Sequence, residues 1–311
     1  MSALDPREEL AQRLGLSAAP TPRFASPEAL SEALTARDYL SSPAIASVTY
    51  LADRLAKPLL IEGPAGTGKT ALAKAVAEAS GARLIRLQCY EGLDEAKALY
   101  EWNYRKQLLR IQASGAAGID QWSERENDIF SEEFLLTRPL LEAIRSVEPV
   151  VLLIDEIDRV ELETEALLLE ILSEYQVSIP ELGTVKATQI PMVFLTSNNT
   201  RELSEALKRR CLYLFLDYPD VARERDIIIS RVPGVSEALA SHIAQVVHSL
   251  RQMDLKKAPS VSETLDWART LVVLGRAELD DALVNETLHL LLKYQSDLEK
   301  AMHALSRPTG A

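Results

Sequence analysis

The sequence has few residues of the kinds that build metal, redox or membrane sites. Its 311 residues include two cysteines, Cys89 and Cys211, and four histidines, and none of them stands at a spacing typical of a metal or redox motif. The cysteines therefore predict two buried, reduced thiols. No apolar run approaches the ~20 residues of a membrane helix. The first ten residues lack the basic end and apolar core of a secretory signal. We therefore expect a cytoplasmic protein with no integral membrane segment.

Basic charge is also scarce. The chain has 34 Lys and Arg residues against 46 Asp and Glu residues, which gives a net charge of −12. Proteins that bind a nucleic-acid backbone need clustered basic residues, so this balance argues against a nucleic-acid partner. One local basic run, Lys208-Arg209-Arg210, is the exception. Otherwise 47% hydrophobic and 26% charged residues are typical of a globular protein with one or two domains.

One glycine-rich motif stands out. Residues 63–70 read Gly-Pro-Ala-Gly-Thr-Gly-Lys-Thr and fit G-x-x-x-x-G-K-[ST], with an apolar strand-like run before them and a helix-forming run after them. Glycines let backbone N–H groups surround a phosphate, and the helix N-terminus adds the positive end of its dipole. The motif predicts a phosphate-binding loop in which Lys69 reaches the β- and γ-phosphates and Thr70 offers its hydroxyl to Mg²⁺. The candidate binding residues are Gly63, Pro64, Ala65, Gly66, Thr67, Gly68, Lys69, Thr70 and Ala71.

A second motif places two acids at the end of a buried strand. Residues 149–154 are a proline and five apolar β-formers, followed by Asp155 and Glu156. Ligands of open α/β sheets bind at the carboxyl ends of strands, and Mg²⁺ prefers oxygen ligands. We predict that Asp155 binds Mg²⁺ and that Glu156 is the general base for the attacking water. In the alternative, both acids simply end the strand and cap the next helix, which is the role we expect for Asp158.

Two further candidates are polar residues near later strands. Asn198 follows the strand-like segment 192–196, where its amide could orient the attacking water or simply form a turn. The run Lys208-Arg209-Arg210 precedes the last predicted strand. An arginine that reached the γ-phosphate bound to a neighbouring subunit would neutralise transition-state charge. Arg210 is the first choice and Arg209 the second, and the alternative is a solvated basic surface.

Strand-like and helix-like segments alternate over residues 41–220, which predicts a parallel α/β sheet with helices on both faces. Residues 221–311 predict a helical domain, and the prolines of residues 1–40 predict a partly ordered N-terminal arm. Trp122 is a candidate contact residue, whereas Tyr100, Trp102 and Tyr104 favour packing over contact with a client. We expect helices over residues 40–55, 94–112, 130–147 and 161–174, an insertion over 113–127 and a β-hairpin within 175–189.

Taken together, these motifs resemble those of AAA+ ATPases. The runs LLIEGPAGTGKT, LLIDEIDR, LLEILSEYQVSIP, FLTSNN and ALKRRC are similar to the MoxR group. The segments QCYEGLDEAKALYEWNYRKQLLRIQ and APSVSETLDWAR further resemble ATPases that assist maturation of aerobic carbon monoxide dehydrogenase, a molybdenum/copper enzyme. The resemblance implies ATP and Mg²⁺ as cofactors, a hexameric ring, a von Willebrand factor A domain partner and a metalloenzyme client.

The resemblance also implies roles for individual residues. Gly63, Gly68, Lys69 and Thr70 would contact the phosphates, Asp155 would bind Mg²⁺, and Glu156 would be the catalytic base. Asn198 would be the first sensor and Arg210 the finger that acts in trans. One position departs from the pattern, because residues 256–263 read KKAPSVSE, without the second-sensor arginine of many relatives. Lys257 is the candidate replacement.

Three functions stay open at this point. The first is a ring ATPase that remodels a protein client. The second is a nucleotide-gated binding scaffold with little turnover, which the missing second-sensor arginine favours. The third is a nucleic-acid motor or loader, which the net charge of −12 disfavours.

Overall fold

The computed structural model describes residues 5–16, 21–113, 129–276 and 278–305. The chain forms two compact units. The first unit comprises Met1–Arg37, Ser41–Glu62 and Leu72–Leu214. The second comprises Asp38–Leu40, Gly63–Ala71 and Phe215–Ala311. The glycine-rich loop therefore groups with the C-terminal helices, whereas the two acids at the end of their strand belong to the first unit.

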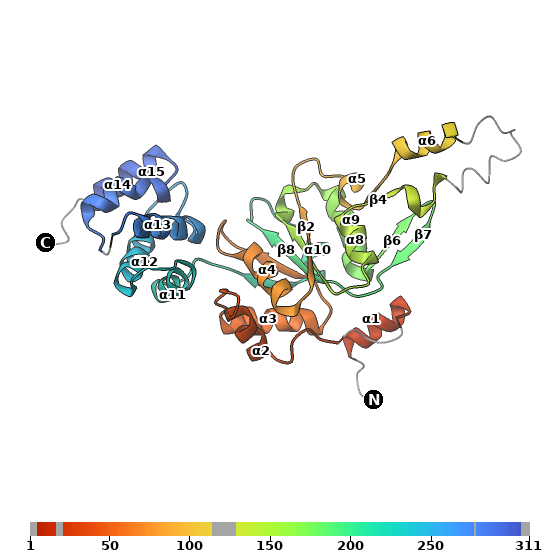
Figure 1. Cartoon of the computed structure of the whole chain (residues 1–311), viewed down its shortest axis with the longest axis horizontal. Helices are drawn as coiled ribbons and strands as arrows, with labels where there is room; N and C mark the ends of the chain where they lie inside the picture. Colours follow the sequence, from red (N-terminus) through yellow and green to blue (C-terminus); the bar gives the residue numbers. More distant parts are fainter. Residues whose placement is uncertain (1–4, 17–20, 114–128, 277, 306–311) are drawn as a thin grey trace, which may run out of the picture. The chain divides into compact units, whose positions relative to one another are not determined.

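A five-stranded sheet forms the centre of the first unit (Figure 1). Its strand order is β2-β5-β8-β1-β9. The pairs β2–β5, β5–β8 and β1–β8 are parallel, which confirms the predicted parallel α/β fold. All residues of β5 and β8 are buried, as expected for apolar central strands. The strands are β1 (Leu59–Glu62), β2 (Arg83–Gln88), β5 (Val150–Asp155), β8 (Met192–Ser197) and β9 (Leu212–Phe215).

Residues 1–40, expected as a partly ordered arm, contain two capped helices, and a third capped helix falls within the helix predicted over residues 40–55. They are α1 (Pro6–Leu14), α2 (Pro27–Thr35) and α3 (Pro43–Arg54). Each begins with a proline, and the side chain of the preceding Asp or Ser accepts a hydrogen bond from a backbone N–H of the first turn. Proline fits the first helical position because no hydrogen bond is needed there. Of the prolines that suggested irregular structure, Pro27 and Pro43 are helix starts, whereas Pro22 lies outside the helices.

The prediction of one long helix over residues 94–112 and another over residues 130–147 is wrong. The first segment divides into α5 (Glu95–Ala98), β3 (Tyr100–Trp102) and α6 (Tyr104–Ala113), because Asp94 and Asn103 each cap a separate helix. The second divides into a 3-10 turn η2 (Glu132–Phe134), β4 (Leu135–Thr137) and α8 (Pro139–Arg145), which begins at its proline. Strands β3 and β4 pair antiparallel.

The aromatic residues of this region have different environments. Trp102 is buried and packs edge-on against Phe130, with ring centroids 5.2 Å apart, whereas Tyr100 is half-buried and Tyr104 is exposed. Packing therefore explains Trp102, and Tyr104 stays available for contact. Trp122 and almost all of the expected insertion, residues 114–127, lie outside the described residues.

Other predicted elements of the first unit are present. The 3-10 turn η3 (Ile157–Arg159) follows β5 and leads to α9 (Leu162–Glu174). Next comes the predicted hairpin, in which β6 (Gln176–Ile179) and β7 (Gly183–Lys186) pair antiparallel. Helix α10 (Glu205–Arg210) then precedes β9.

The C-terminal part of the second unit is helical. Its apolar core surrounds Trp267, which is fully buried and donates a hydrogen bond from Nε1 to Thr287 Oγ1 at 2.8 Å. Among the described helices of the chain, none is long and apolar enough to cross a membrane. The helices are α11 (Val221–Arg231), α12 (Glu237–Arg251), α13 (Val261–Val273), α14 (Asp281–Leu291) and α15 (Gln295–Leu305).

Candidate functional site

The glycine-rich loop connects β1 to α4 (Lys69–Ser80). Gly66 has φ +75°, and a Cβ atom built there would lie 2.4 Å from Cβ of Ser260, so only glycine fits. The ammonium of Lys69 is buried and donates to the carbonyl oxygens of Gly63 and Pro64, both at 2.7 Å. A glycine loop that opens a twelve-residue helix, with a lysine folded over it, has the donors that a phosphate needs. These residues fit a nucleotide phosphate.

We expect Gly66→Ala to destabilise the protein more than Gly275→Ala. Both glycines have positive φ and belong to the second unit, but nothing lies within 4 Å of a Cβ built at Gly275. Alanine at either position adds the strain of the left-handed region, ~1–2 kcal/mol. Only position 66 adds the clash with Ser260, worth roughly 1–3 kcal/mol more. Urea unfolding of the two variants measures the difference, and equal losses would contradict the close approach.

The acids at the end of β5 are held by hydrogen bonds and ion pairs. Asp155 is buried; its Oδ1 accepts from the hydroxyl of Thr196, and its Oδ2 accepts from Nε of Arg86 at 3.0 Å. Glu156 adopts φ +58° and its carboxylate pairs with Arg159 at 2.7 Å. The backbone N–H of Glu156 donates to Thr196 Oγ1 at 2.9 Å. Thr196 therefore connects β8 to both acids. The carboxylate oxygens of Asp155 are hard ligands of the kind that Mg²⁺ prefers.

Asp158 has a different role from the helix cap that we expected. It is 3% exposed and lies within η3, and its Oδ2 accepts from the backbone N–H of Asn198 at 3.2 Å. The same oxygen accepts from the N–H and hydroxyl of Thr200 at 2.9 and 2.6 Å. Burial alone would raise the pKa of Asp158, but the hydrogen bonds from Thr200 and Asn198 outweigh it and lower that pKa. Asp158 thus attaches the loop that carries Asn198 to the turn that follows Glu156.

The acids at the end of β5 and in η3 act together on the thiol of Cys89. Burial raises its pKa to about 12, and the carboxylates of Asp155, Asp158 and Glu156 add to the effect. All three acids are therefore within electrostatic range of one buried sulfur. In the part of the chain that the structure describes, no group of three His, Cys, Asp or Glu side chains could hold a metal ion alone. A Mg²⁺ site would need ligands beyond these carboxylates, as is usual for Mg²⁺ held with substrate phosphates.

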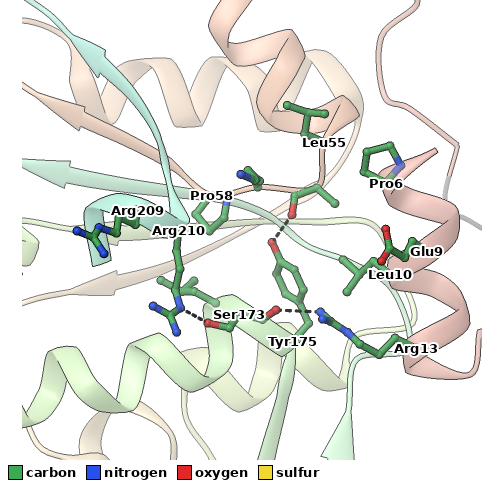
Figure 2. A pocket seen from close by; sticks show the side chains of 13 residues that line it. Pro6, Glu9, Leu10, Arg13, Leu55, Pro58, Ser173, Tyr175, Arg209 and Arg210 are labelled. Carbon is green, nitrogen blue, oxygen red and sulfur yellow. Dashed lines mark hydrogen bonds between the residues drawn. The ribbon is translucent and has the colours of Figure 1, made fainter. Parts of the chain in front are cut away.

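Arg209 and Arg210 lie at the end of α10, and both are exposed. Arg210 donates from Nε to the hydroxyl of Ser173, at the end of α9 (Figure 2). Its Nη1 donates to the carbonyl oxygen of Ala206 at 3.0 Å. In the described structure these bonds direct Arg210 to α9 and α10 rather than to Asp155 or Glu156. The two arginines are thus presented at the surface of the first unit.

The start of α13 lacks the second-sensor arginine in the structure as in the sequence. Lys257, the candidate replacement, pairs with Glu263 on α13 at 2.9 Å. A different arginine reaches this region: Arg251 of α12 forms a buried ion pair with Glu224 and donates from Nε to the carbonyl oxygen of Pro259 at 2.8 Å. No sequence motif predicts this contact, because it depends on the packing of α11 against α12.

Three comparisons place the chain among known proteins. The family model "ATPase family associated with various cellular activities (AAA)" matches residues 59–216. The gas vesicle ATPase GvpN of Ancylobacter aquaticus is 29% identical over 231 residues, which are 70% of this chain and 61% of GvpN. An uncharacterized protein of Staphylococcus haemolyticus is 27% identical over 227 residues, 71% of this chain and 78% of that protein. The chain thus spans about three-fifths of the length of GvpN.

Among solved structures, the RuvB Holliday junction branch migration motor of Thermotoga maritima aligns with a TM-score of 0.44 and 18% identity. It covers 85% of this chain and 67% of RuvB. The family match includes the glycine-rich loop, the acids of β5, Asn198 and both arginines of α10. It confirms the resemblance to AAA+ ATPases, and the finer resemblance to the MoxR group stays a prediction. Because the family model matches half of the sequence, this chain belongs to the AAA family.

Proposed function

We propose that the protein is a ring-forming ATPase that hydrolyses ATP with Mg²⁺ and uses the cycle to remodel a protein client. The observation that carries the proposal is the corner at the ends of β5 and β8, where Thr196 holds Asp155 and Glu156 and Asp158 holds the Asn198 loop. This corner combines a buried acid, a half-buried acid and an amide, in a chain that also has a phosphate loop.

Each residue has a role in this proposal. Lys69 and the loop glycines bind the phosphates, and Thr70 and Asp155 hold the metal. Mg²⁺, when bound, neutralises charge on the phosphate oxygens. Glu156 accepts the proton of the attacking water, and Asn198 orients that water. To do so, Glu156 must leave Arg159, which costs little because the pair is half-exposed. Arg210 is supplied to the site of the next subunit.

The client and partner are the least constrained part of the proposal. The resemblance to the MoxR group supports a hexamer, a von Willebrand factor A domain partner and a metalloenzyme client, with maturation of a carbon monoxide dehydrogenase-type enzyme as the specific case. The relative GvpN is named a gas vesicle ATPase, which agrees with the ATPase activity and points to no metalloenzyme. Client identity therefore needs a direct experiment, such as capture of partners by Glu156→Gln chains.

Two alternatives differ in what they expect of ATP. A nucleotide-gated scaffold would activate its client equally with ATP and with a non-hydrolysable analogue. The missing second-sensor arginine at residues 256–263 favours this alternative, and Lys257, the candidate replacement, pairs with Glu263. A nucleic-acid motor would bind DNA or RNA in a salt-dependent way, and the net charge of −12 opposes it.

The deciding measurement is the rate of ATP hydrolysis per chain against protein concentration, with Mg²⁺ present. We expect a rate that rises steeply and then saturates, because Arg210 completes the site of another subunit. An arginine finger is worth roughly 10³-fold or more in rate. Oligomer mass should rise with ATP and Mg²⁺ over the same range, because ligands that bridge subunits stabilise the assembly.

The other outcomes separate the parts of the proposal. A constant, appreciable rate means that each chain is self-sufficient, which would remove the ring and the trans finger together. Absence of hydrolysis at every concentration would favour the scaffold.

A further inference from the structure

A cavity of about 390 Å³ lies beside Arg210 on the first unit (Figure 2). Its lining comes from segments far apart in the sequence, namely α1, the turn before β1, the end of α9 and the end of α10. The lining carries four cationic side chains, Arg13, Lys57, Arg209 and Arg210, and one carboxylate, Glu9. In a chain with a net charge of −12, a local excess of cations needs a physical reason.

The four cations have no carboxylate partner within the part of the chain that the structure describes. Arg13 and Arg210 instead approach Ser173 from opposite sides, as Figure 2 shows. Arg13 donates to the carbonyl oxygen of Ser173 at 3.0 Å, and Arg210 donates to its hydroxyl. Glu9 lies one helical turn before Arg13 but forms no ion pair with it in the described structure. Two guanidinium groups that bond to one serine repel each other, and an anion in the cavity would reduce that repulsion.

Lys57 belongs to the same electrostatic neighbourhood. Burial raises the pKa of the Cys211 thiol to about 12, and Lys57 and Arg210 act in the opposite direction. Both cations are therefore within electrostatic range of one sulfur, although 153 positions of sequence separate them. The turn before β1 and the end of α10 thus present positive charge to the same place.

Arg13 is held on a fixed element. Leu10, Ala11 and Leu14 of α1 are buried, and Arg7 pairs with the buried carboxylate of Asp53 at 2.7 Å. Ser173 is equally fixed, because α9 ends at the buried Tyr175, whose hydroxyl donates to the carbonyl oxygen of Ala56 at 3.0 Å. A site built on rigid elements loses little entropy when a ligand binds.

We propose that this cavity is a phosphate-binding site in which Arg13 of α1 acts together with Arg210, and that Lys57 and Arg209 strengthen it. Guanidinium groups bind phosphate with paired N–H donors. A phosphate group carries more charge than a carboxylate, so it matches several cations better than an acidic peptide does. The phosphates come from a nucleotide held by a second copy of the chain or from a free phosphate compound. The first source rests on the proposed function, and the second does not.

One experiment tests direct binding without the ATPase cycle. The full chain carrying Lys69→Ala, which disables the phosphate loop, is titrated with tripolyphosphate in a calorimeter without Mg²⁺. We expect binding that weakens at least about tenfold when Arg13→Ala is added. Arg37→Ala is the matched control, because Arg37 is an exposed arginine just after α2 that also bonds to a carbonyl oxygen. Arg13→Lys, which keeps the charge, should retain part of the binding.

A second experiment tests the neighbour's nucleotide as the source. We expect Arg13→Ala to lower kcat at least about tenfold with nucleotide affinity unchanged, while Arg37→Ala changes neither. Mixing Arg13→Ala chains with Glu156→Gln chains should then restore part of the activity. The first kind of chain supplies the base and the second supplies the cavity, so restored activity requires that the cavity act on another subunit.

The outcomes separate the sources and the proposals. If only the tripolyphosphate titration depends on Arg13, the ligand of the cavity is a free phosphate compound. If only the mixing experiment restores activity, the ligand is the nucleotide of a neighbouring subunit. If the wild-type chain hydrolyses no ATP, the proposed function fails while the titration still decides the cavity. The phosphate site is overturned if Arg13→Ala changes neither measurement, or if polyglutamate binds more tightly than tripolyphosphate. If Arg13→Ala folds poorly, Lys57→Ala replaces it in both the titration and the mixing experiment.

Discussion

Glu156→Gln is expected to bind ATP with nearly wild-type affinity and to hydrolyse it at least about 10²-fold more slowly. Glutamine keeps the size of the side chain and tolerates φ +58° as well as glutamate does, but it cannot accept the proton of water. The backbone bond from residue 156 to Thr196 does not involve the side chain and should persist. Fluorescent-nucleotide titration and phosphate release at saturating ATP measure binding and turnover separately.

The control is Glu163→Gln, which makes the same charge change on an exposed residue in the first turn of α9. It should leave both measurements unchanged. Unimpaired hydrolysis by Glu156→Gln would remove Glu156 as the base. Loss of nucleotide binding would instead show that the carboxylate acts through Arg159, its partner at 2.7 Å, and not through water.

The fold could largely be predicted because its strong signals are local. Continuous apolar runs predict the buried strands β5 and β8, and the alternation of strands with helices predicts a parallel sheet. The error at residues 94–112 has a clear cause. The helical spacing of apolar residues continues across Asn103, although Asn103 caps a new helix. Asn103 accepts a hydrogen bond from the N–H of Lys106 and starts a new helix, so β3 can pair with β4. That pairing joins residues about 35 apart in the sequence.

The candidate site divides in the same way. The residues that would contact nucleotide stand in contiguous motifs, and spacing alone identifies them as candidates. The residues that hold these candidates in place do not stand in such motifs. Thr196 and Asp158 each lie about 40 positions from the groups to which they bond. Arg86 is a residue of β2 that meets Asp155 only through the parallel register of β2 and β5. Such contacts follow from the sheet order, which the motifs do not specify.

Asp53→Ala is expected to cost about 3–5 kcal/mol of stability, the largest loss that we predict for a single substitution. The carboxylate of Asp53 is fully buried and binds two guanidinium groups, those of Arg7 and Arg23, each at 2.7 Å. It also accepts from the backbone N–H of Arg23 at 2.8 Å. Burial lowers the pKa of Arg7, and Asp53 opposes that effect, so the carboxylate supports the charged form of the arginine. Removing it leaves the buried charge of Arg7 and the largely buried charge of Arg23 without their shared counter-ion.

The matched control is Glu142→Ala, which breaks an ion pair with Arg83 whose two side chains are both about half-exposed. Exposed pairs contribute ~0–1 kcal/mol, so this variant should unfold near the wild-type urea midpoint. An equal loss in the two variants would contradict the role of the buried cluster. Hydrogen exchange adds a spatial test, because Asp53, in the last turn of α3, pairs with Arg7 of α1. If Asp53 anchors α1, the amides of α1 should lose protection before the strands of the sheet do. Arg13, at the end of that helix, would then lose the fixed position from which it contacts Ser173.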